Sequence, residues 1–336
     1  MKLKLFFAAF VSIVWVSIPQ NIIGCGPGID PYDYYTSFIS NKIASDATYN
    51  PFYYSGNTFL YNEQEPVNTS EILATEWAGY CGKPVTDADA QLFVTGFTHE
   101  ELKKLYAHIE KKQPLQVSNA VKTNSMSNYF IRSKDLEGLG YVMYAKLVEP
   151  YVIGGNNDWE ALKRDSLKMD RLMKNGRQLY GAAKTDFFKL KFGYQVTRLA
   201  HYSGNYAAAI IAYDELVANN TTTSVLQPMS LALKAGALWR TGKEMDAAYL
   251  FSKAFSASPA KRISNYISFD WAVDSKKSRE EYLKLCSNNK EKADMLALFA
   301  ISSPEDETET VHIQGLAIIW GPCRLGSRHP CSPAPR

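Results

Sequence analysis

Four short stretches hold residue types that could do chemistry, but none has the spacing that the chemistry needs. His99 opens HEELK, yet a zinc-protease helix needs a second His four residues later, where this chain has Lys103. GALWRTGKE, from Gly236, has the glycines and lysine of a phosphate-binding loop, with one residue too many between the glycines and Glu244 where Ser or Thr would hold magnesium. DADA, from Asp87, and GGNND, from residue 154, offer oxygen ligands but not the positions of a calcium loop. The sequence therefore predicts no catalytic residue, no metal and no cofactor, and an enzyme is the less favoured alternative.

The charge balance argues against nucleic acid as a partner. The 336 residues include 37 Lys and Arg against 34 Asp and Glu, a net charge of +3, and the two signs are interspersed along the chain. Nucleic-acid binding needs basic residues gathered on one face. A hydrophobic share of 46% indicates a folded protein with room for a substantial core.

The N-terminus has the layout of an export signal. Lys2 and Lys4 precede an apolar run from Leu5 to Ile18, and Pro19 ends it. The run is about 14 residues, shorter than the roughly 20 that cross a bilayer as a helix. We predict a signal peptide over residues 1–24, with a buried helix as the alternative.

The sequence IIGC, which ends at Cys25, resembles a bacterial lipobox. The resemblance implies cleavage before Cys25, acylation of its sulfur and a mature lipoprotein held in the membrane of the cell envelope, outer-membrane or periplasmic. The insert PQN, residues 19–21, departs from the pattern because a lipobox usually follows the apolar run directly. Cys81 and Cys286 are expected to be either free or paired, since no metal spacing is present.

Residues 25–69 are rich in Tyr and Pro. The turn formers Pro27, Pro31, Pro51 and Gly56 interrupt any helical period, so this segment is predicted to be irregular. Its tyrosines are expected to cap the end of a helical array rather than to form a surface for carbohydrate or peptide.

Residues 70–303 are predicted to be mainly α-helical. Ser70 is expected to cap a first helix, and Thr98 with Glu101 forms a capping box before a second. Further helical segments begin at Ser133, Asn157 and Arg177, and residues 278–302 are expected to form one more pair with a turn at 288–289.

Two units between residues 190 and 261 resemble tetratricopeptide repeats, in which two helices of about 34 residues in total cross at small side chains. The resemblance implies an α-solenoid of antiparallel helix pairs, because one pair cannot bury its own apolar face. Thr197 departs from the pattern, since a small residue belongs there. The residues that define the two units are Gly204, Ala209 and Tyr213 in the first, and Ala235, Gly242, Ala247, Phe251, Ala254 and Pro259 in the second.

The favoured function is a non-catalytic scaffold that binds an unknown protein or peptide. Side chains expected to face outward from the first helix of each unit are Tyr194, Gln195, Arg198, Lys234 and Arg240. The alternative is a glycan-capture lipoprotein similar to the starch-binding SusD-like family, although the signature residues of that family are not matched. The stretch CGPGIDPYDYY, from Cys25, resembles the mature ends of repeat-bearing Bacteroidetes lipoproteins, which implies the same address.

The last segment, 304–336, changes character abruptly. An acidic stretch is followed by a Gly, Pro, Cys and Arg tail with neither helical period nor cap. We expect it to be unstructured or to come from a frame-shifted reading, and we place no site there.

Overall fold

The computed structural model describes residues 68–153 and 165–302, all within one compact unit. These ranges are mainly helical and contain no strand, which confirms the predicted α class. The signal peptide, Cys25, nearly all of the Tyr-rich segment and the tail after residue 303 lie outside the described residues. No helix of the described ranges has both the length and the apolar character to cross a membrane.

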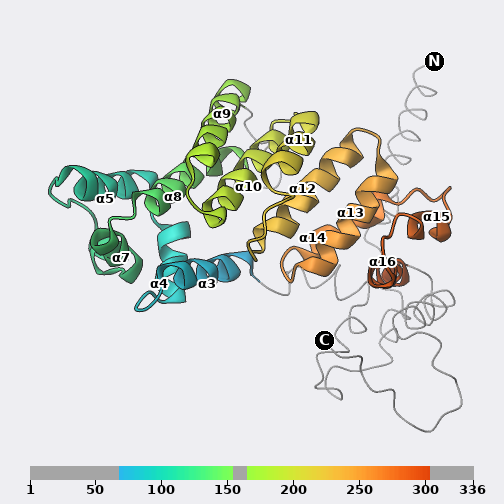
Figure 1. Cartoon of the computed structure of the whole chain (residues 1–336), viewed down its shortest axis with the longest axis horizontal. Helices are drawn as coiled ribbons and strands as arrows, with labels where there is room; N and C mark the ends of the chain where they lie inside the picture. Colours follow the sequence, from blue (N-terminus) through green and yellow to red (C-terminus); the bar gives the residue numbers. More distant parts are fainter. Residues whose placement is uncertain (1–67, 154–164, 303–336) are drawn as a thin grey trace, which may run out of the picture. The chain divides into compact units, whose positions relative to one another are not determined.

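The helices follow one another with short connections (Figure 1). The first part contains α3 (Thr69–Cys81), α4 (Asp87–Gln91), the π-helix η3 (Leu92–Gly96), α5 (His99–Lys111), α6 (Asn119–Thr123), α7 (Ser125–Ser133), α8 (Leu136–Val148) and the 3-10 helix η4 (Glu149–Tyr151). The second part contains α9 (Ser166–Ala182), α10 (Asp186–Tyr202), α11 (Tyr206–Leu216), α12 (Leu226–Arg240), α13 (Glu244–Ala257), α14 (Arg262–Ala272), α15 (Arg279–Leu283) and α16 (Asn289–Ser302).

Capping side chains decide where several helices begin. The Thr98 and Glu101 box before α5 is confirmed, with the Glu101 backbone N–H bonded to the Thr98 hydroxyl at 3.3 Å. The cap predicted at Ser70 is wrong by two residues. Asn68 caps α3 instead, because its side-chain oxygen accepts the Ser70 backbone N–H at 2.9 Å.

The boundary predicted near Arg177 is also wrong, because α9 continues to Ala182. Gly176 lies buried inside this helix rather than at a turn, and a Cβ there would meet the hydroxyl of Tyr144 on α8. The glycine is needed for close packing. The boundary between α9 and α10 lies at Thr185 instead. The Thr185 hydroxyl accepts the Phe188 backbone N–H and caps the start of α10.

The two predicted units correspond to α10 with α11 and α12 with α13. Gly204 and Gly242 form the turns with φ of +82° and +77°, a conformation that favours glycine. Helix α10 packs against α11 and also against α12, and α12 packs against α13 (Figure 1). The small residues at the crossings, Ala209, Ala235, Ala247 and Ala254, are all fully buried. Thr197, at the position that departed from the pattern, is buried with its hydroxyl bonded to the Gly193 carbonyl oxygen.

The C-terminal pair is less regular than predicted. The box formed by Ser278 and Glu281 starts α15, but this helix ends at Leu283, well before the expected turn. Helix α16 begins at Asn289 and packs against α13 and α14. Phe299 of α16 meets Phe269 of α14 edge to face, with ring centroids 5.2 Å apart.

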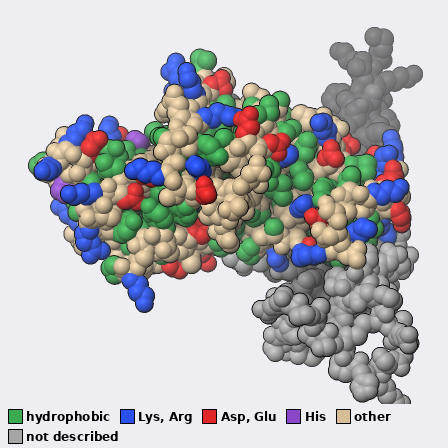
Figure 2. All heavy atoms as spheres, viewed as in Figure 1, with side chains coloured by type: hydrophobic (Ala, Val, Ile, Leu, Met, Phe, Trp, Pro, Cys, Tyr) green, Lys and Arg blue, Asp and Glu red, His purple; other side chains and the backbone are tan. Residues whose placement is uncertain are grey.

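An aromatic core joins α3 to the start of α10. The Tyr80 ring stacks on Phe187 with centroids 4.7 Å apart, and Trp77 meets Phe187 edge to face at 5.6 Å. Trp77 is 1% exposed. The face drawn in Figure 2 has hydrophobic, basic and acidic side chains interspersed over the described helices, in agreement with the even charge pattern of the sequence.

Candidate functional site

The deepest charged group of the described residues is Lys191 on α10, which is 2% exposed. Its ammonium lies 4.7 Å from the Trp77 ring centroid and 4.4 Å from that of Phe187. Glu76 of α3 supplies the counter-charge, with 3.8 Å between the Lys191 nitrogen and a carboxylate oxygen. Ring faces and a carboxylate together compensate for part of the water that the ammonium loses.

Glu76 connects this buried charge to the beginning of α12. Its carboxylate accepts the Ser224 hydroxyl at 2.8 Å and the Val225 backbone N–H at 2.9 Å, two groups almost 150 residues away in the chain. An acidic group is favourable there because the N-terminus of a helix carries partial positive charge. Glu76 therefore joins three helices.

Burial lowers the pKa of Lys191 to about 8, and the opposing effect of Glu76 limits the shift. A lysine with so low a pKa could act as a base or a nucleophile. The aromatic rings around Lys191 leave the amine almost no exposed surface, so we assign it a structural role.

The structure corrects the outward orientation predicted for Tyr194 and Gln195. Each is 6% exposed, because α10 is covered both by α8 and α9 and by α11 and α12. Gln195 donates to the Tyr141 hydroxyl at 3.2 Å, while its own carbonyl oxygen is buried without a partner. Helical period alone does not show that a helix is covered on two sides.

Arg198 and Lys234 are half-buried and already have partners. The Arg198 guanidinium donates to the Val152 carbonyl oxygen at 3.3 Å, and Lys234 pairs with Asp214 at 2.6 Å. The Lys234 ammonium also lies 5.1 Å from the Tyr213 ring centroid. These two side chains tie neighbouring helices together.

Arg240 is the one member of the predicted set that is exposed, and it lies beside an aromatic pair made of the half-buried Trp239 and the exposed Trp271. Its guanidinium is 4.8 Å from the Trp239 ring centroid. Trp239 in turn stacks on Trp271 of α14, with centroids 6.2 Å apart and planes inclined by 27°. Trp271 is 63% exposed. We call Trp239, Arg240 and Trp271 the tryptophan platform.

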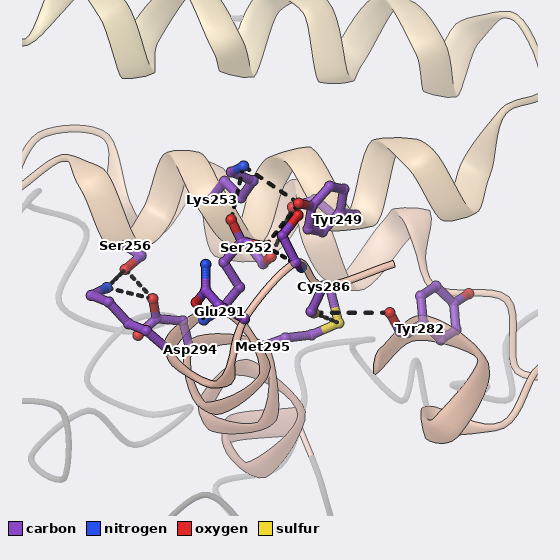
Figure 3. Close-up of polar contacts among 12 residues, drawn as sticks. Tyr249, Ser252, Lys253, Ser256, Tyr282, Cys286, Glu291, Asp294 and Met295 are labelled. Carbon is purple, nitrogen blue, oxygen red and sulfur yellow. Dashed lines mark hydrogen bonds and ion pairs between the residues drawn. The ribbon is translucent and has the colours of Figure 1, made fainter. Parts of the chain in front are cut away.

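A second polar cluster, drawn in Figure 3, lies between α13 and α16. Glu291 accepts the Tyr249 hydroxyl at 2.8 Å and pairs with Lys253 at 2.9 Å. Burial opposes ionisation of Glu291, but hydrogen bonds from the Ser287 backbone, Lys253 and Tyr249 outweigh it and lower its pKa. The ionised carboxylate therefore has three donors, which marks a helix contact rather than a catalytic acid.

The two cysteines in the described ranges are free thiols, which settles the choice left open for Cys81 and Cys286. Burial raises the pKa of Cys81 to about 12 and also raises that of Cys286. The Cys286 sulfur lies 4.0 Å from the Met295 sulfur (Figure 3). Thiols that remain protonated are poor nucleophiles.

Sequence reasoning missed the Lys191 cluster, the tryptophan platform and the α13–α16 cluster. The first and third depend on contacts between distant segments. The sequence did contain a sign of the tryptophan platform. Trp271 follows Asp270 at the end of a short helical pattern, and no apolar residue stands three or four positions after it, which is typical of a side chain outside the core.

Across the described ranges, no three His, Cys, Asp or Glu side chains gather in a way that could hold a metal ion. Comparison of the chain with models of known protein families, with curated proteins and with solved structures gave no match. The interpretation of this chain therefore rests on its geometry.

Proposed function

We propose that this chain is a non-catalytic scaffold, built as a solenoid of antiparallel, tetratricopeptide-like helix pairs, that binds another protein or peptide. Two units with the same glycine turn, each followed five residues later by a fully buried alanine, Ala209 and Ala247, support the repeat. Stacked pairs of this kind present rows of helix ends and faces to a partner.

The observation that carries the binding function is the tryptophan platform. Trp271 is 63% exposed and packs against a second tryptophan beside an arginine, so it belongs to a cluster and is not a single scattered apolar side chain. Trp and Arg are the residue types that most often dominate protein interfaces. Trp239, Arg240 and Trp271 place both types together at the ends of α12 and α14.

Photo-crosslinking tests this function. A photoreactive residue at Ser275, four residues after Trp271, is introduced into the full chain in its native cells, with Leu167 on α9 as a control position that is also exposed. The expected result is a discrete protein captured from Ser275 but not from Leu167, whose purified form binds the full chain. Capture of no protein from either position, or equal capture from both, would contradict a binding function at this face.

We propose further that the chain is exported and anchored in the cell envelope through an acylated Cys25. The lysines, the apolar run and the lipobox-like IIGC support this address. Intact-mass measurement on the membrane fraction is expected to give a chain that begins at a lipid-bearing Cys25, and Cys25→Ser is expected to release the protein. A chain that keeps Met1 would contradict the anchor.

Glycan capture is the second candidate, and the exposed Trp271 ring favours it because a flat aromatic face can also pack against the apolar face of a sugar. Two binding assays distinguish the peptide-binding function from glycan capture. A peptide partner is displaced by other peptides, whereas a glycan-binding protein is retained on immobilised polysaccharide.

A further inference from the structure

Three lysines of the described ranges lie over an aromatic ring and also pair with a carboxylate. The ring holds the cation on one side, and the carboxylate neutralises it on another. Three such sets are complete within the described ranges: Lys191 with Trp77 and Glu76, Lys234 with Tyr213 and Asp214, and Lys253 with Tyr249 and Glu291.

Arg240 forms the same arrangement without the carboxylate. It lies 4.8 Å from the Trp239 ring centroid, but it makes no ion pair with any described residue. The acids close to Arg240 and Trp271 in the sequence, namely Glu244, Asp246, Asp270 and Asp274, form no ion pair with Arg240 within the described ranges, and Asp274 accepts the Lys276 backbone N–H at 2.9 Å. A guanidinium held by a ring is oriented in advance for a bidentate carboxylate.

Trp271 adds an exposed apolar surface close to the Arg240 guanidinium. Through Trp239, the Arg240 guanidinium and the Trp271 ring are at most about 11 Å apart. An extended peptide covers that span in about three residues at about 3.3 Å each. A carboxylate and a large apolar side chain within three residues of each other could therefore reach both groups.

We propose that the tryptophan platform docks a peptide segment in which an Asp or Glu side chain lies within three residues of an aromatic or large aliphatic one. The carboxylate pairs with Arg240, and the apolar side chain packs on Trp271. This inference rests on the proposed function, since it names the partner class of the same surface. A peptide fits better than a sugar because a mobile backbone can bring the two groups to the two contacts independently.

Selection from a displayed library of random peptides tests the proposal. The full chain is immobilised and the bound sequences are read. The expected result is enrichment of acidic residues within three positions of Phe, Tyr, Trp, Leu or Ile. With a synthetic peptide taken from that selection, Trp271→Ala and Arg240→Ala are each expected to weaken binding by more than about tenfold.

Charge reversal makes the test specific. Arg240→Glu is expected to exchange the acidic preference for a basic one while the apolar preference remains. Leu167→Ala, which removes an exposed apolar side chain on α9, is the matched control and should leave binding unchanged. All of these side chains are exposed, and an unchanged thermal melting curve verifies the fold of each variant.

Several outcomes would overturn the proposal. Enriched peptides without acidic residues, or peptides whose binding survives Trp271→Ala and Arg240→Glu, would leave the scaffold function intact but move the docking surface elsewhere. Retention of the wild-type chain, but not Trp271→Ala, on an immobilised uronic-acid polysaccharide without peptide enrichment would assign the platform to glycans. A dimer that Trp271→Ala dissociates in light scattering would assign it to a second copy of this chain.

Discussion

The Lys191 ammonium is buried in the core, and its ion pair with Glu76 offsets part of the cost of burying the charge. Glu76→Gln removes the counter-charge and leaves one acceptor oxygen in place of the two that Ser224 and Val225 use, because the amide nitrogen can only donate. Leaving a buried charge without its partner typically costs about 3 kcal/mol or more. We expect urea unfolding at pH 7 to show a loss of that order. The control is Lys191→Met in the Glu76→Gln background, which should recover most of it, and a double variant as unstable as Glu76→Gln alone would contradict this role.

The pKa of Lys191 also predicts how stability changes with pH. The folded value of about 8 lies below the ordinary 10.5, so between these pH values the unfolded chain binds the proton that the folded chain has released. Stability from this group therefore increases as pH rises from 8 towards 10.5. Relative to Lys191→Met, which has no group to titrate, we expect the wild type to gain about 2 kcal/mol in unfolding free energy between pH 7 and pH 10. If the unfolding free energies of the two proteins changed in parallel with pH, Lys191 would not have a lowered pKa in the folded chain.

At the scale of the elements, glycine turns join α10 to α11 and α12 to α13. Gly242 has a φ of +77°, and no atom lies within 4 Å of the place that a Cβ would take, so an Ala there would be strained by its backbone alone. We expect Gly242→Ala to lower the unfolding free energy by about 1 kcal/mol. Gly140→Ala is the matched control, because Gly140 also has open space but lies inside α8, where Ala should stabilise by up to about 1 kcal/mol. Equal effects in the two thermal melts would show that the turn needs no glycine.

The helices and turns that depend on neighbouring residues could be predicted from the sequence. Local signals were sufficient for the box at Thr98 and for the turns at Gly204 and Gly242, because each depends on a few neighbouring residues. Gly176 misled the prediction, since its purpose is contact with Tyr144 on another helix. The same limit applies to the site. Arg240 was predicted from its position, but its Trp271 neighbour comes from a different helix.

At the scale of the whole molecule, Glu76 joins helices that a simple linear stack of repeats would keep apart. In such a stack each unit contacts only its neighbours, so distant units can open independently. Here α3 contacts the beginning of α12 through Ser224 and Val225, and a continuous aromatic core runs from Trp77 to Phe188. Opening of α3 therefore exposes the N-terminal end of α12 as well.

Hydrogen exchange can test this coupling between distant helices. In the wild type, the amides of α3 and of the first turn of α12 are expected to open with similar free energies. Glu76→Gln should reduce protection at both places together, because it removes the carboxylate that bonds to the start of α12 and pairs with Lys191. Helix α16, which packs on α13 and α14, serves as the internal control and should keep its protection. Loss of protection in α3 alone would mean that Glu76 stabilises this helix without coupling its opening to that of α12.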